Sequence, residues 1–266
     1  MGYVFDFLDA KRYNEWMQRQ ENRYAADLES HLMLGMLDPV AGESILDIGC
    51  GSGASLRPML NKGLDVTGID PSPYMLDILA ETLGNRVALF RGFAEDLPFD
   101  DNSFNHAILF TSLEFVDDPQ KALAEAFRVA KDRVFIGFLN RYALTGIGRR
   151  VKGIFTPTIY NRASFFSVWE IKNMVRKLMG PVPVCWRTVC QFPGSWGPWM
   201  KQIESSGLVQ RFPFGTFAGM VITLVPRLRT RPLAIRYEPK EVGGVTAGAT
   251  GCTGIGSCGG SDRFSW

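Results

Sequence analysis

The stretch Ser44–Gly53, which reads S-I-L-D-I-G-C-G-S-G, decides the fold of this chain. Its apolar residues Ile45, Leu46 and Ile48 predict a short buried strand, and three glycines at alternate positions follow the strand. Glycine lets the backbone turn sharply and lets a ligand approach without a Cβ in the way. A helix start follows at Ala54, so the stretch predicts a strand, a tight turn and a helix N-terminus that together form a ligand-binding corner.

The composition is that of an ordinary globular protein. Hydrophobic residues make up 46% and charged residues 21% of the 266 residues, which is enough for one large α/β domain. The formal net charge is only +2 and no nucleic-acid motif is visible, so we expect no nucleic-acid partner. No apolar run reaches the roughly 18–20 residues of a membrane span, and the residues 1–9 do not resemble a secretory signal.

Cysteine and histidine usage argues against disulfides and metal. The cysteines are odd in number and scattered, which does not indicate a disulfide framework. With only His31 and His106 as histidines, the chain offers few ligands for zinc. We therefore expect a cytoplasmic protein without a metal site. The cysteines are Cys50, Cys185, Cys190, Cys252 and Cys258.

Strand-like and helix-like segments alternate downstream of the corner. The predicted strands are 44–49, 64–69, 86–91, 104–111 and 133–139, and the predicted helices are 54–62, 71–83 and 117–131. This alternation predicts a doubly wound, mostly parallel sheet of the α/β class. In such sheets the ligand binds outside the C-terminal strand ends, where the strand order reverses.

Four parts are expected along the chain. The apolar spacing over 11–37 predicts a helix that either packs on the next domain or covers the site. Residues 164–179 predict a further helix, 182–192 and 217–225 predict strands, and 193–216 predicts an insertion rich in Gly and Pro. The parts are an N-terminal helical cap (1–39), a core (40–140), the remainder of the sheet with substrate-recognition insertions (141–226) and a glycine-rich, flexible tail (227–266).

Two carboxylates narrow the choice of ligand. Gly49, Gly51 and Ala54 satisfy the G-x-G-x-x-G/A pattern of a dinucleotide site. However, Asp47 lies inside the strand, where it favours a cation over a pyrophosphate, and Asp70 ends the second strand, where it can accept ribose hydroxyls. S-adenosylmethionine (SAM) has a ribose, an amino group and no phosphate. Alternatively, Asp47 is a structural acid and Asp70 caps the helix that begins near position 71.

Five ordered segments resemble one family. They are I-L-D-I-G-C-G-S-G (45–53), V-T-G-I-D-P-S (66–72), A-E-D-L-P-F (94–99), D-N-S-F (101–104) and F-V-D-D-P-Q-K-A-L-A-E-A-F-R-V (115–129). This chain resembles the class I SAM-dependent methyltransferases, in particular the type 11 group that includes quinone-biosynthesis C-methyltransferases. The resemblance covers roughly residues 40–140 and implies a Rossmann-like methyltransferase fold.

The resemblance also implies the cofactor contacts. The glycines would approach the methionyl part of SAM, Asp47 its amino group and Asp70 its ribose. Two further pairs would pack on the adenine and border its edge, and the end of the fourth strand would lie near the methyl group. The implied cofactor-binding residues are Asp47, Gly49, Cys50, Gly51, Gly53, Asp70, Pro71, Met75, Ala94, Glu95, Thr111 and Ser112.

Three departures from the family pattern bear on function. Phe93 replaces an acid that would bond the adenine amino group, and Asn105 replaces an acid that commonly follows the phenylalanine of strand four. Glu114-Phe115 replaces a frequent histidine pair. Glu114 is therefore a candidate general base; the alternative is a salt-bridged acid at a helix start. His106, in the middle of a strand, is expected to be structural.

The acceptor side is expected outside the core. Residues 141–177 carry eight basic side chains against one acid, Glu170, with aromatic residues between them. This pattern indicates a solvated face, an anionic acceptor or a peripheral contact with an anionic membrane that gives access to a lipid-like acceptor. The residues Phe192, Trp186, Trp196, Trp199 and Phe212 either line a hydrophobic acceptor pocket or pack within a cap.

The sequence thus predicts a methyltransferase that passes a methyl group from SAM directly to a small-molecule or lipid-like acceptor, leaving S-adenosylhomocysteine (SAH). Two alternatives stay open. Phe93 and the missing histidine pair favour a non-enzymatic, regulatory SAM-binding module. The glycine spacing alone favours an NAD-dependent oxidoreductase.

Overall fold

The structure, a computed structural model, describes residues 2–143, 163–190 and 206–224. All of them belong to one compact unit of the chain, Met1–Arg227. The predicted tail and its two cysteines lie outside the described residues. So do all four basic residues between 144 and 162, and Phe192, Trp196 and Trp199. The four-part division of the chain therefore stays a prediction.

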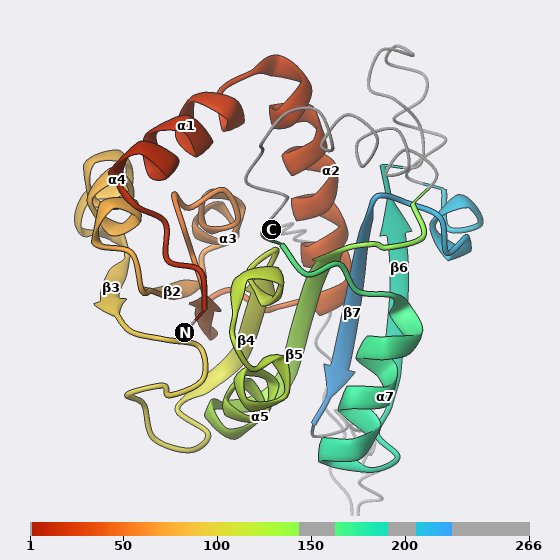
Figure 1. The fold of residues 1–266 in the computed structure, drawn as a ribbon. Coiled ribbons are helices and arrows are strands. Elements are labelled where there is room, and N and C mark those ends of the chain that lie inside the picture. Colours follow the sequence, from red (N-terminus) through yellow and green to blue (C-terminus); the bar gives the residue numbers. More distant parts are fainter. Residues whose placement is uncertain (1, 144–162, 191–205, 225–266) are drawn as a thin grey trace, which may run out of the picture. The chain divides into compact units, whose positions relative to one another are not determined.

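A single seven-stranded sheet forms the centre of this unit (Figure 1). The strand order is β3-β2-β1-β4-β5-β7-β6, and β7 runs antiparallel to both of its neighbours, β5 and β6. The predicted doubly wound, mostly parallel sheet is confirmed, and the order reverses between β1 and β4. The strands are β1 (Ser44–Ile48), β2 (Asp65–Asp70), β3 (Ala88–Arg91), β4 (Phe104–Phe110), β5 (Ala130–Leu139), β6 (Val184–Val189) and β7 (Phe217–Thr223).

Helices pack on both faces of the sheet because the central strands are apolar on both faces. Leu46 and Ile48 share one buried cluster with the apolar faces of α5 and α7, whereas Ile45 belongs to a second cluster with α2, α3 and α4. None of the described helices is long and apolar enough to cross a membrane. The helices are α1 (Phe7–Met17), α2 (Gln20–Leu37), α3 (Leu56–Asn61), α4 (Pro73–Leu83), α5 (Pro119–Val129) and α7 (Val168–Met179).

The prediction of one helix over 11–37 is wrong. Two helices form instead, and they meet at Gln18 and Arg19, where the chain carries neither glycine nor proline. The side chain of Asn22 donates a hydrogen bond to the carbonyl of Trp16 (2.7 Å), which fixes this corner. The end of the second helix is confirmed, since Asp38 adopts a left-handed conformation directly after Leu37.

The helix predicted from 164 begins only at Val168. Residues 164–167 are not helical, and Phe166 forms a bridge to Asn140 after β5. Ser167 then caps the helix in a reciprocal arrangement with Glu170. Strand β5 likewise begins earlier than predicted, at Ala130, because α5 ends directly before it. The predicted strand over 182–192 is described as Val184–Val189.

Candidate functional site

The glycines of the loop after β1 serve two purposes. All three have positive φ, at +75° for Gly49, +50° for Gly51 and +83° for Gly53. A Cβ on Gly49 would overlap Ser112, and a Cβ on Gly53 would overlap Leu79. A Cβ on Gly51 would meet no atom within 4 Å, so this residue borders open space. The outer glycines therefore allow packing, and the middle one leaves room for a ligand.

Asp47 is a buried carboxylate without enough hydrogen-bond donors. Its side chain is fully buried, and Oδ2 accepts a hydrogen bond from Ser55. Oδ1 is also buried and has no hydrogen-bond partner within the described part of the chain. Burial raises the pKa of Asp47 to about 7, against the effect of the Ser55 hydrogen bond. A cationic ligand at Oδ1 would supply the missing partner.

Asp70 lies at the end of β2 and holds the glycine loop. Oδ2 accepts from the Gly51 amide (2.9 Å) and Oδ1 from the Ser72 amide (2.8 Å). Burial raises the pKa of Asp70, and the two backbone hydrogen bonds oppose this rise. Each carboxylate oxygen keeps a second lone pair that can accept from a ribose hydroxyl. The cap of α4 is Ser72, whose side chain accepts from the Met75 amide, so the alternative reading of Asp70 as the helix cap is wrong.

The remaining residues implied for cofactor contact differ in where their side chains lie and in what they contact. Cys50 is buried against Gly68, so its thiol faces the sheet, and burial raises its pKa. Ala94 is buried in the core, and Met75 is buried in the first turn of α4 after Pro71. The carboxylate of Glu95 accepts from the amides of Asp117 (2.8 Å) and Asp118 (3.3 Å), and it thereby fixes the start of α5. Contact of Cys50, Pro71, Met75, Ala94 and Glu95 with the cofactor stays a prediction.

The end of β4 carries backbone strain. Thr111 has a φ of +51°, which a β-branched residue rarely adopts, and its amide donates to the Gly137 carbonyl (2.8 Å). The Ser112 hydroxyl donates to the Ile48 carbonyl (2.6 Å) and ties the end of β4 to the end of β1. Strained residues such as Thr111 cluster at functional sites, and Thr111 and Ser112 both lie where the strand order reverses.

Glu114 is the second buried carboxylate with an open oxygen. It lies in the turn η2 (Leu113–Phe115) after β4, with only 1% of its surface exposed. Oε1 accepts from the Leu139 amide at the end of β5 (2.6 Å), while Oε2 is buried and has no hydrogen-bond partner in the ranges described. Burial raises the pKa of Glu114 to about 7. The salt-bridge alternative is therefore not what the described residues form.

The N-terminal segment 2–6, here called the strap, was missed by sequence reasoning. The Tyr3 amide donates to the Phe115 carbonyl (2.8 Å), and the Ser72 hydroxyl donates to the Phe5 carbonyl (2.7 Å). The rings of Phe5 and Phe115 pack edge to face with centroids 5.3 Å apart. The strap therefore joins the start of α4 to the turn after β4. The aromatic residues at alternate positions before α1 were the available signal.

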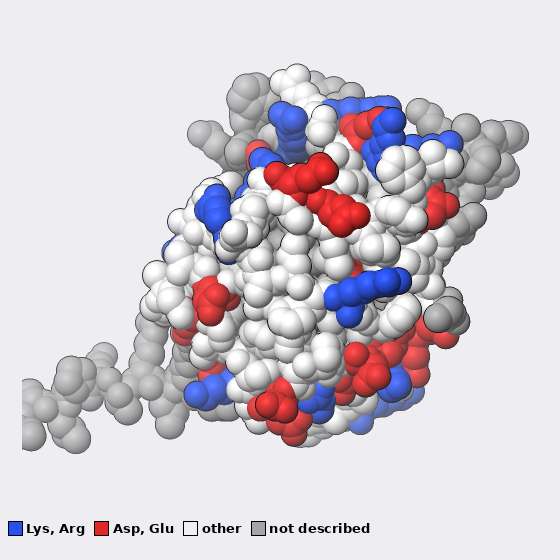
Figure 2. Space-filling view, turned by 90° about the vertical axis from the view of Figure 1, so that its left-hand side faces the viewer, with Lys and Arg blue, Asp and Glu red and all other residues white. Residues whose placement is uncertain are grey.

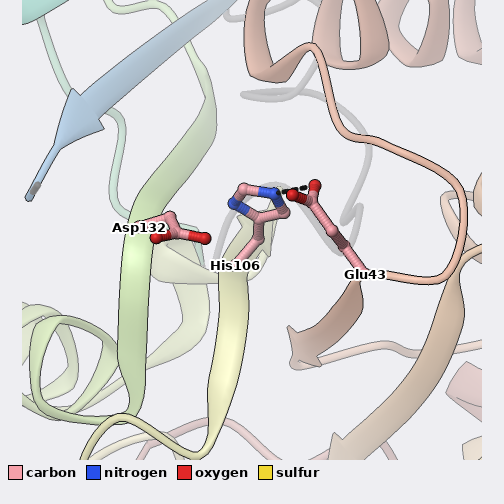
Figure 3. Close-up of side chains that lie close together, drawn as sticks. All are labelled: Glu43, His106 and Asp132. Carbon is pink, nitrogen blue, oxygen red and sulfur yellow. Dashed lines mark hydrogen bonds and ion pairs between the residues drawn. The ribbon is translucent and has the colours of Figure 1, made fainter. Parts of the chain in front are cut away.

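A third polar cluster lies at the opposite end of the parallel strands from the glycine loop (Figure 3). Nε2 of His106 lies 2.8 Å from Oε2 of Glu43, which also accepts from the Val40 amide (2.8 Å). Asp132 lies on the other side of the imidazole ring and accepts from the side chain of Asn105 (3.1 Å). The three ligand-type atoms lie within 4.8 Å of one another. The imidazole ring lies between the two acids. The expectation that His106 is structural and the expectation of no metal both stay predictions.

This is an α/β protein with a mostly parallel sheet, a glycine loop and two buried carboxylates, Asp47 and Asp70. Such a site is suited to a nucleoside that carries a cationic group. A family model described as "Methyltransferase domain" matches residues 46–136. An uncharacterized protein of Methanocaldococcus jannaschii is 32% identical over 180 residues, which cover 66% of this chain and 80% of that protein. The chain belongs to the SAM-dependent methyltransferase family, whose cofactor is SAM.

Further relatives match over about a third of this chain. An uncharacterized methyltransferase of Mycobacterium tuberculosis is 40% identical over 93 residues, which cover 35% of this chain and 37% of that protein. A demethylmenaquinone methyltransferase of Tropheryma whipplei is 42% identical over 101 residues, 36% of this chain and 41% of that protein. The chain thus spans well under half the length of these relatives.

A solved structure agrees with the fold. The crystal structure of a SAM-dependent methyltransferase from Thermotoga maritima, described as a possible histamine N-methyltransferase, superposes with a TM-score of 0.66. It is 25% identical, and the match covers 82% of this chain and 96% of that one.

Proposed function

We propose that this protein transfers the methyl group of SAM to a small-molecule or lipid-like acceptor. The observation that carries the proposal is the buried Asp47, whose Oδ1 lacks a partner beside a glycine loop that Asp70 holds in place. An uncompensated buried carboxylate costs free energy unless a ligand supplies a cation or a donor. The family assignment favours SAM over the dinucleotide that the glycine spacing alone would allow.

The residues of the site have separate tasks in this proposal. Asp47 would hold the ammonium group and Asp70 the ribose hydroxyls, with the loop around Gly51 leaving room for the chain between them. SAM, when bound, supplies an electrophilic methyl group on a positively charged sulfur. The strap and the buried turn after β4 exclude water from the space at the ends of β1 and β4, which favours transfer to the acceptor over loss to solvent.

We further propose that the acceptor is hydrophobic and quinone-like. Several relatives are named demethylmenaquinone methyltransferases, and their matches cover between 35% and 38% of this chain. The aromatic side chains Tyr3, Phe5 and Phe115 gather beside the turn after β4, where a flat apolar ring could pack. This choice of acceptor follows the relatives' names and the aromatic cluster.

Glu114 is the residue proposed to move a proton. Its Oε2 would accept the proton that an acceptor hydroxyl, amine or enol loses when its electron pair forms the bond to the methyl carbon. A pKa of about 7 suits a general base at neutral pH, because the carboxylate is partly ionised and still basic enough to take the proton. The hydrogen bond from Leu139 goes to Oε1, so Oε2 has no hydrogen-bond donor among the described residues and keeps its lone pairs for the proton.

Calorimetry tests the cofactor. We expect the protein to bind SAM and SAH but not NAD, and Asp47→Asn to weaken SAM binding while the exposed control Asp65→Asn does not. Tight NAD binding without SAM binding would reject the proposal.

Methyl transfer tests the acceptor. Labelled SAM is incubated with a reduced demethylmenaquinone analogue, simple phenols and amines, and product is extracted. Transfer to the quinol is expected; SAM binding without transfer to any acceptor would favour the non-enzymatic module.

Glu114 is tested with the acceptor that gives transfer. In Glu114→Gln, kcat should fall and lose its rise between about pH 6 and 8, while SAM affinity is retained. The exposed α4 variant Glu81→Gln is the control. Turnover that is unchanged in Glu114→Gln would show that the residue is no base.

A further inference from the structure

The outer face of α7 combines exposed aromatic rings with cations. Trp169 is 58% exposed and Tyr142 is 53% exposed, and their rings lie edge to face with centroids 6.0 Å apart. Lys172 and Arg176 follow Trp169 at spacings of three and seven residues, so they share its side of the helix, and Lys177 lies next to them. We call these five residues the α7 face.

The opposite side of α7 accounts for the packing of the helix. Val168, Ile171 and Val175 are buried in the core cluster that covers one side of the sheet. The α7 face is therefore not needed to hold the helix in place. A large apolar side chain such as Trp169 that stays exposed beside cations indicates a contact outside the chain.

The charge of this face is positive. Glu170 is the only acid of α7, and it is engaged by Arg141 (2.6 Å) and by the capping serine, Ser167. Among the described residues, no carboxylate forms an ion pair with Lys172, Arg176 or Lys177. By contrast, the face of the molecule shown in Figure 2 carries acidic and basic side chains side by side.

From this geometry we propose that the α7 face docks on an anionic membrane surface. Tryptophan and tyrosine prefer the boundary between headgroups and acyl chains, since one end of each ring system is apolar and the other polar. Lysine and arginine bind the negative surface potential while their apolar stems lie along it. A helix with buried aliphatic residues on one side and this combination on the other fits a bilayer surface better than a soluble anion, which would leave Trp169 and Tyr142 in water.

The α7 face begins near the ends of β4 and β5 that carry the candidate site. The Arg141 amide donates to the Phe166 carbonyl (2.8 Å), and the Ser164 amide donates to the Glu114 carbonyl (2.9 Å). The start of α7 is therefore connected to the ends of β4 and β5, where the proposed methyl transfer takes place. Docking here would bring a membrane-dissolved acceptor close to the site; this consequence rests on the proposed function, whereas the docking itself does not.

Vesicle sedimentation of the full chain tests the proposal. The probes are vesicles of phosphatidylcholine with and without phosphatidylglycerol, at low and high salt. We expect binding to the anionic vesicles that weakens with salt. Each cation near such a surface contributes a factor of about five, so Lys172→Gln, Arg176→Gln and Lys177→Gln together should weaken binding on the order of 100-fold.

The controls separate this face from general charge. Arg23→Gln, Lys62→Gln and Arg86→Gln remove the same number of exposed cations elsewhere and should leave most of the binding intact. Trp169→Ala should weaken binding at high salt as well, because its contribution is apolar.

Three outcomes would overturn the proposal: equal binding to neutral and anionic vesicles, an α7-face variant that binds like its control, or binding to a soluble polyanion such as heparin but not to vesicles. Calorimetry with SAM on the same variants keeps the two proposals apart. In the α7-face variants, vesicle binding should be lost while SAM binding is intact. A wild-type chain that binds SAM but no anionic vesicles rejects the docking and leaves the proposed function, whereas a chain that binds vesicles through this face but no SAM rejects the proposed function and leaves the docking.

Discussion

The affinity for SAM should depend on pH through Asp47. In the ligand-free protein, burial raises the pKa of this carboxyl from 3.8 to about 7, which corresponds to roughly 4 kcal/mol against ionisation. A bound ammonium group favours the ionised form, so the pKa falls in the complex. Below about pH 7 binding must therefore release a proton. The apparent affinity should fall about tenfold for each pH unit between about pH 7 and pH 5.

The variant Asp47→Asn removes both the negative charge that attracts the ammonium group and the pH dependence of SAM affinity. It should bind SAM more weakly by on the order of 100-fold at pH 8, since a buried charge pair loses one partner, and its weak binding should no longer vary between about pH 5 and 7. Its stability should change in the opposite direction. The folded-state pKa of Asp47 is raised, so its contribution to stability is present below about pH 4 and is lost as the pH rises through about 7. The ligand-free variant should therefore resist unfolding better than wild type at pH 8, by up to about 4 kcal/mol.

Calorimetry in two buffers of different ionisation enthalpy measures the released protons directly. We expect release of about one proton on SAM binding near pH 6 in wild type and none in Asp47→Asn. Because Glu114 also has a pKa of about 7, Glu114→Gln serves as the matched control and should keep the proton release. An affinity that stays flat from about pH 5 to 7 in wild type would refute the reasoning.

Three further predictions concern stability and release. Gly49→Ala should destabilise the fold by roughly 3 kcal/mol in urea unfolding because its Cβ overlaps Ser112, whereas Gly51→Ala should weaken SAM binding more than it affects stability. Phe5→Ala should speed SAH dissociation in stopped-flow measurements, since the ring holds the strap on Phe115; an unchanged rate would separate the strap from the cofactor. Glu43→Gln should lower the melting temperature without altering SAM affinity, because its contact with His106 lies at the opposite end of the parallel strands from the glycine loop.

The fold was predictable because its signals are local. Apolar runs such as 45–48, proline and serine at helix starts, and the glycine loop each specify a strand, a cap or a turn within a few residues. The break between α1 and α2 was missed because Gln18 and Arg19 carry no such signal. The helix start at Val168 was missed because Phe166 is drawn to Asn140, a partner far along the chain.

The residues of the candidate site can be picked out from the sequence, but the hydrogen bonding of their carboxylates cannot. The pattern indicates Asp47, Asp70 and Glu114, yet the open oxygens depend on contacts that sequence spacing does not reveal. Glu114 takes its hydrogen bond from Leu139, 25 residues away, and Phe5 receives one from Ser72, 67 residues away. Whether a carboxylate is left short of donors depends on such distant partners, and so does its pKa.

Ser72 carries a consequence for regulation. Its amide binds Asp70, its hydroxyl accepts from the Met75 amide, and the same hydroxyl donates to Phe5 in the strap. The single residue Ser72 thus links Asp70, the start of α4 and the strap through consecutive hydrogen bonds. Such linkage is reciprocal: if the cofactor tightens the strap by some factor, then any partner or modification that pulls the N-terminus away must weaken the cofactor by that same factor. A change in how the strap is held should therefore change how much cofactor is bound at the site beside Asp70.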